Sequence, residues 1–96
     1  MRADYDSQGD TLQITLVDVD HADYGDDAIP GAIVAIRNGG PVAIDVLNAG
    51  QGTERPLEAV AERYGLDIEA LTAAARAALA GPDRTVIIDL LARAAA

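Results

Sequence analysis

The sequence predicts a single α+β domain spanning residues 1–96, with a small antiparallel sheet, two short helices and a C-terminal strand. Two observations predict the sheet: apolar residues alternate with other residues after position 10, and two β-prone runs flank Asn38-Gly39. A third observation predicts the helices, because the apolar spacing changes to three and four residues after position 56.

The first expected strand covers residues 10–18, where Leu12, Ile14 and Leu16 recur with a period of two. Residues 18–31 hold five aspartates, two glycines and a proline, and this composition is typical of a loop. Asn-Gly is the strongest short hairpin signal, because both central residues of a type I′ turn need positive φ. A hairpin with its turn at residues 38–39 therefore follows the loop.

A two-residue turn at these positions places Arg37 opposite Gly40 and Ala35 opposite Val42. In this register Val34 and Ile36 share a face with Ala43, and both faces of the hairpin are mostly apolar. Such a sheet needs cover on both sides.

The helices are expected as a helical hairpin over residues 56–80. Pro56 is tolerated in a first helical turn, Gly65-Leu66 is typical of a Schellman stop, and Asp67 can cap the second helix. Gly81-Pro82 ends that helix, and residues 84–91 are expected to form the last strand.

The composition favours association with a second copy. The chain has no Phe or Trp and one Met, so its core must be built from smaller aliphatic side chains. Closed twofold association is a common way to bury an uncovered apolar face. We therefore expect a homodimer, with an interaction surface at Val34, Ile36, Val86, Ile88 and Leu90.

The formal charge of −9 argues against nucleic acid and membrane surfaces as partners, because both are anionic. Nine aspartates lie in residues 1–50 against Arg2 and Arg37, so the acidity belongs to the N-terminal half. The absence of cysteine fits a reducing compartment, and no signal-peptide pattern or long apolar run is present. The expected location is the cytoplasm.

Residues 4–50 resemble the DUF2283 family of small bacterial proteins. The resemblance is carried by Tyr5-Asp6, Asp10, the alternating strand, the run GAIVAIR, a Gly-bearing turn and VAIDVLNA. It departs from the family at residues 43–45, where Ala-Ile-Asp stands in place of the usual Gly-Ile-Glu. The resemblance implies a small antiparallel meander, a bacterial cytoplasmic setting and a helical C-terminal extension. It implies no catalytic residues, because the family has no assigned activity.

Residues 57–79 also fit the spacing of a helix-turn-helix. The second helix, however, would offer DNA Asp67, Glu69 and a single Arg76, with no Lys, Asn or Gln to contact base edges. A helical hairpin that packs on the sheet is the favoured interpretation.

The acidic loop offers weak metal candidates, because clustered carboxylates suit Ca²⁺ or Mg²⁺. The spacing of an EF-hand fails: counted from Asp18, the sixth residue is Asp23 instead of Gly and the twelfth is Ile29 instead of Glu. A solvated loop is favoured, with no metal and no cofactor. The candidates are Asp18, Asp20, Asp23, Asp26 and Asp27.

A catalytic set cannot be assembled from the usual residue types. His21 is the only imidazole, Ser7 is the only serine, and no phosphate-binding glycine motif exists. The expected function is therefore a non-catalytic protein–protein interaction module that binds a basic partner, as a small antitoxin-like or adaptor protein would. The alternative is a self-assembling structural homodimer without another ligand, and metal or DNA binding ranks below both.

Overall fold

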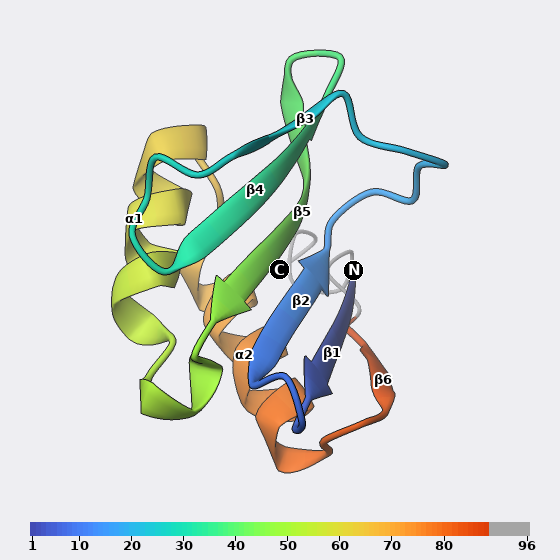
Figure 1. Cartoon of the computed structure of the whole chain (residues 1–96), viewed down its shortest axis with the longest axis vertical. Helices are drawn as coiled ribbons and strands as arrows, with labels where there is room; N and C mark the ends of the chain where they lie inside the picture. Colours follow the sequence, from blue (N-terminus) through green and yellow to red (C-terminus); the bar gives the residue numbers. More distant parts are fainter. Residues whose placement is uncertain (89–96) are drawn as a thin grey trace.

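The computed structural model describes residues 1–88 and shows one sheet with two helices packed on one of its faces (Figure 1). The six strands lie in the order β3-β4-β5-β2-β1-β6, and every neighbouring pair is antiparallel. The predicted α+β class is confirmed. The strands are β1 (Arg2–Asp6), β2 (Thr11–Thr15), β3 (Tyr24–Asp26), β4 (Ala32–Arg37), β5 (Gly40–Leu47) and β6 (Thr85–Ile87).

The turn between β4 and β5 lies where the sequence predicts it. Asn38 and Gly39 have φ values of 53° and 80°, and Arg37 pairs with Gly40. Positive φ at both central residues is the requirement of a type I′ turn, which explains the Asn-Gly pair.

The predicted register beyond the turn is wrong. The register shifts between Ala35 and Ile36, since Ile36 pairs with Pro41 while Ala35 pairs with Ala43, and Val42 is the extra residue of a β-bulge. Beyond the bulge Val34 therefore pairs with Ile44 instead of lying on the opposite face. One face of the hairpin collects the fully buried side chains of Val34, Ile36, Ile44 and Val46, and the other carries Ile33, Ala35, Ala43, Asp45 and Leu47.

Two strands were not predicted. β1 forms a hairpin with β2 and lies between β2 and β6, and the three-residue β3 forms inside the expected loop, next to β4. The predicted C-terminal strand is present as β6, although it is shorter than residues 84–91. Residues 89–91 of that prediction lie outside the described residues.

The helices follow their sequence signals. After a short 3₁₀ turn (Ala49–Gln51), α1 (Glu54–Tyr64) ends at Gly65, whose φ is 67°, and the Leu66 amide donates to the Ala61 carbonyl as a Schellman motif requires. α2 (Ile68–Ala80) begins at Asp67, whose carboxylate accepts from the amides of Glu69 and Ala70.

The core lies between the sheet and the helices. α1 covers β4 and β5, while α2 covers β1, β2 and β6. The core side chains of the sheet and of the helices are aliphatic, and the largest of them are almost completely buried: Leu12, Ile14, Val34, Ile36, Ile44, Val46, Leu57, Val60 and Leu71. The opposite face of the sheet has no helix over it among the described residues, and we call it the open face.

Candidate functional site

The open face presents two cross-strand rows of side chains, fixed by the strand register. The first row runs through Gly25, Ala35, Ala43 and Thr15, and we call it the small-residue row. The second runs through Ile33, Asp45, Gln13 and Asp4, and we call it the acidic row. Because side chains of one face meet directly across neighbouring strands, each row is a continuous line over the middle of the sheet.

The acidic row is held by hydrogen bonds that leave its charge in place. The Gln13 amide donates to Asp45 at 3.0 Å, and the Thr85 hydroxyl donates to Asp4 at 2.6 Å. Both donors are neutral. Neither of these two contacts therefore places a cation beside the carboxylates.

The loop between β2 and β3 lies beside the small-residue row, on the side away from the acidic row. Two ion pairs tie it to the sheet: Arg2 to Asp18 at 2.5 Å and Arg37 to Asp20 at 2.6 Å. The hydrogen bond from Arg37 lowers the pKa of the Asp20 carboxyl. Arg37 also donates to the His21 carbonyl. Both arginines of the N-terminal half are thus already bound to carboxylates of their own chain.

A cleft of about 230 Å³ lies between this loop and the sheet. Thr15, Ala35 and Ala43 of the small-residue row line it, together with the ion pair of Arg2 and Asp18. The other residues of the lining are mostly apolar: Gln13, Val17, Val19, His21, Ala22 and Val42. The floor is low because these strand residues carry short side chains. A long side chain from outside could lie here without displacing the core.

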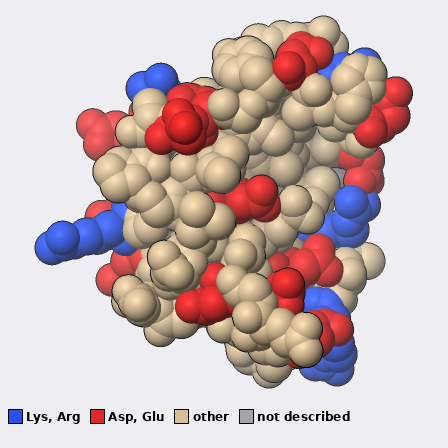
Figure 2. Space-filling view, viewed as in Figure 1, with Lys and Arg blue, Asp and Glu red and all other residues tan. Residues whose placement is uncertain are grey.

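Charge is unevenly distributed over the molecule. Figure 2 shows acidic side chains across the open face, while basic side chains gather toward its rim. The helices are nearly balanced by comparison, since α1 and α2 carry four glutamates and three arginines. The open face with its loop carries a net negative charge, from Asp4, Asp45, Asp18 and Asp20 against Arg2 and Arg37.

The five aspartates proposed as weak metal candidates point to different partners. Asp18 and Asp20 pair with arginines, Asp23 accepts from the Asn38 amide, and Asp26 contacts α1. Within residues 1–88, no three carboxylate or imidazole groups converge on a position that could hold a metal ion. The Asp27 side chain is exposed.

Asp26 connects the edge strand β3 to α1. The Tyr64 hydroxyl donates to it, and Arg63 Nε lies 3.0 Å from its Oδ2. These contacts hold the pKa of the Asp26 carboxyl below its usual range, while burial raises the pKa of the Tyr64 hydroxyl. The contact fixes β3 against the helix layer, and we assign it a structural role.

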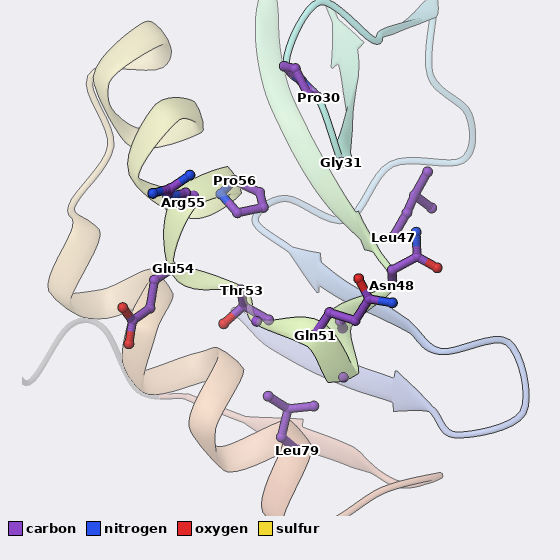
Figure 3. Close-up of a pocket in the computed structure, with 13 residues that line it drawn as sticks. Pro30, Gly31, Leu47, Asn48, Gln51, Thr53, Glu54, Arg55, Pro56 and Leu79 are labelled. Carbon is purple, nitrogen blue, oxygen red and sulfur yellow. The ribbon is translucent and has the colours of Figure 1, made fainter.

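A second, larger depression of about 780 Å³ lies where β4, β5 and α1 meet (Figure 3). Glycines, Pro30 and Pro56 form much of its lining, and its only ionisable side chains are Glu54 and Arg55. The Thr53 side chain makes no hydrogen bond to the start of α1. The lining contains one hydroxyl side chain, that of Thr53, and one carboxylate, that of Glu54.

His21 and Ser7 do not come together. His21 lies in the loop after β2, whereas Ser7 lies in the turn before β2 and bonds to Asp83. The two residues are at opposite ends of that strand. No described arrangement joins them in a nucleophile–base pair.

The residues expected to form an interaction surface are mostly not exposed. Val34 and Ile36 are 1% and 2% exposed in the core, so the prediction is wrong for both; the register shift explains why. Val86 and Ile88 are half-buried, and Leu90 lies outside the described residues. Ile87, which was not chosen from the sequence, is 77% exposed on β6.

No helix within residues 1–88 is long and apolar enough to cross a bilayer. A scan against family models finds none that matches the chain, and searches of curated proteins and of solved structures find no match. The resemblance of residues 4–50 to the DUF2283 family stays a prediction.

Proposed function

We propose that this protein is a non-catalytic interaction module that binds a basic protein partner through the open face of its sheet. The observation that carries the proposal is the combination of an uncovered sheet face with a net negative charge. Asp4, Asp45, Asp18 and Asp20 lie on or beside this face, and its two arginines are already paired.

Electrostatics supports a cationic partner. An anionic face speeds the encounter with a positively charged protein and disfavours anionic partners such as nucleic acid. The sheet also offers a rigid surface, because its opposite side is anchored to two helices. The proposal requires no bound cofactor and no metal.

Binding of a fluorescently labelled oligoarginine peptide tests the proposal. Asp4→Asn combined with Asp45→Asn should weaken binding about tenfold, because it removes two charges from the acidic row and keeps their hydrogen-bond acceptors. The matched control is Glu58→Gln with Glu62→Gln, which removes two charges from the exposed side of α1. Fluorescence anisotropy at two salt concentrations measures both.

The control should change binding less than about twofold at moderate salt, because screening limits the reach of surface charges. Equal weakening by both double variants would show that only the total charge matters. No binding by the wild type would contradict the proposed function itself.

Self-association is a second candidate function, and the exposure of Ile87 favours it. β6 is the last strand of the described sheet, so no described strand pairs with its outer edge. An exposed apolar residue on such an edge favours pairing with another strand. A twofold axis beside β6 would continue the sheet into a second copy.

We expect the wild type to scatter light as a dimer and Ile87→Glu to shift it toward the monomer, because a charge at the edge opposes strand pairing. Tyr24→Glu is the matched control, since Tyr24 is 60% exposed on β3, the strand at the opposite edge of the sheet from β6. A wild type that remains monomeric at tens of micromolar, a range at which stable dimers with Kd near 1 μM are populated, would contradict this candidate.

A further inference from the structure

We infer that residues 18–30, which we call the strap, open and close as one unit over the outer edge of β4 while the rest of the fold stays closed. The strap follows β2, contains the three-residue strand β3 and leads into β4, along whose outer side it runs (Figure 1). Three features favour separate opening: the strap contributes little to the core, two fixed points bound it, and four of its aspartates fasten it to other elements.

The strap contributes little to the core. None of its residues is buried, and only Asp26 and Ile29 are half-buried. The buried hydrophobic residues of the described chain all lie outside it. Because burial of apolar surface is the main stabilising term in folding, a segment that buries little of it opens at a lower free-energy cost than the core does.

Two fixed points bound the strap. Just before it, the Leu16 and Val17 amides both donate to the Val42 carbonyl of β5, at 2.8 and 3.1 Å. Just after it, the Gly31 carbonyl accepts from the Leu47 amide at 2.9 Å, and Gly31 has a φ of 81°, which glycine adopts without strain. The sheet therefore holds the backbone on both sides of the strap, and the residues between can move without pulling on β2 or β4.

Two aspartates fasten the first part of the strap to the sheet. Asp18 contacts Arg2 of β1, and Asp20 contacts Arg37 at the end of β4. Arg37 also donates to the His21 carbonyl at 2.8 Å. The Asp18 and Asp20 side chains are 74% and 79% exposed, and exposed ion pairs are individually weak because water and salt screen them. These contacts position the strap and still allow its release.

Two further aspartates fasten the second part. Asp23 Oδ2 accepts from the Asn38 amide of the β4–β5 turn at 2.9 Å, and Asp26 accepts from Arg63 and Tyr64 at the end of α1. With 15% of its side chain exposed, Asp26 is better shielded from water than the two ion-paired aspartates before it. We call these four aspartates the anchors. They reach two strands, a turn and a helix, so closing the strap requires all of these elements to be in place.

Opening changes the edge of the sheet. Of the described strands, β3 pairs only with β4, and it covers Val34, Ala35 and Ile36 of that strand. When the strap opens, β4 becomes the last strand on this side, and the backbone groups that paired with β3 lose their partners. An uncovered edge of this kind is a template for another extended chain, and a loop that covers it prevents such pairing. The strap thus controls access to β4.

Amide hydrogen exchange tests the inference, because it reports opening residue by residue. The Asp23 amide donates to the Ile36 carbonyl at 2.7 Å, and the Asn38 amide donates to Asp23, so both bonds break when the strap opens. In the wild type both amides should exchange at least about a hundredfold faster than the amides of β2, with little dependence on urea, because opening the strap exposes little surface. A urea dependence equal to that of β2 would overturn the inference, since the strap would then open only with the whole domain.

Asp26→Asn should speed exchange of the Asp23 and Asn38 amides about tenfold, because it removes the charge of the best-shielded anchor and thereby destabilises the closed strap. Asp27→Asn is the matched control, since Asp27 is the next residue, loses the same charge and is exposed without being an anchor. It should change both rates less than about twofold. If Asp26→Asn affects only the amides within two residues of itself, the strap does not open as one unit.

A core substitution separates opening of the strap from unfolding of the domain. Ile44→Val destabilises the core, so it should speed exchange of the β2 amides about fivefold or more. The Asp23 and Asn38 amides should stay within about twofold of the wild type, because Ile44 remains buried when the strap opens. Equal acceleration of strap and β2 amides would overturn the inference. These measurements need no partner, so their outcome does not depend on what binds the open face.

Discussion

Val34→Lys is expected to leave the chain unfolded in buffer without denaturant. Val34 lies in β4 against the helix layer and is 1% exposed. A lysine at this position must therefore either bury its ammonium group in the core or displace the helices from the sheet. Breaking a core with an unpaired charge costs about 3–5 kcal/mol, a large part of the stability of a small domain. Circular dichroism and a urea titration measure the loss.

Ile33→Lys is the matched control for this change. Ile33 is the preceding residue of the same strand, but it lies on the open face and pairs with Asp45. A lysine at this position can reach that carboxylate, so the free energy of unfolding should change by less than about 1 kcal/mol. If Ile33→Lys unfolds the chain and Val34→Lys does not, the register described here is wrong.

Ile44→Ala is expected to lower the free energy of unfolding by about 2–5 kcal/mol. Ile44 is fully buried in the central strand β5, where it is paired with Val34 on one side and Ile14 on the other. The surrounding strands and helices cannot all move inward, so the substitution leaves a cavity. Chemical denaturation with an unchanged m-value measures the effect.

Leu47→Ala removes similar apolar volume near the end of the same strand. Leu47 is 40% exposed, so much of its side chain is already in water, and the expected loss is below about 1 kcal/mol. Equal destabilisation by the two changes would contradict the described layering of core and open face.

Local signals in the sequence were sufficient for the turn and the helices. Asn38-Gly39 specifies its own backbone geometry, and Gly65 and Asp67 mark helix ends through contacts only a few residues away. Such features depend on neighbours in the chain, so sequence patterns report them reliably.

Features that depend on distant residues were missed. β1 carries Arg2, Asp4 and Asp6 on its outward side, so little apolar alternation marks it as a strand. β3 has three residues and exists because β4 lies beside it. The bulge at Val42 shifts one strand against another, and Pro41 beside it is its one local signal, because proline inside a sheet is tolerated at bulges.

Of the candidate site, only the negative charge could be predicted from the sequence. An excess of aspartate in the N-terminal half indicated an anionic surface, but the face that carries it depends on the register of four strands. The pairs Arg2–Asp18 and Arg37–Asp20 join residues 16 and 17 positions apart. Each pair joins the loop to a strand, so it depends on how the loop packs on the sheet and not on a local pattern.

The position of β1 between β2 and β6 has a consequence for synthesis on the ribosome. β1 can form its hairpin with β2 as soon as both have emerged, but its other edge waits for residues 85–87, more than 80 positions later. Until then the nascent sheet presents an unpaired strand to its surroundings. Once residue 83 has emerged, its carboxylate accepts hydrogen bonds from the amide and hydroxyl of Ser7 in the β1–β2 turn. This contact holds the C-terminal segment beside β1, where β6 completes the sheet at that edge.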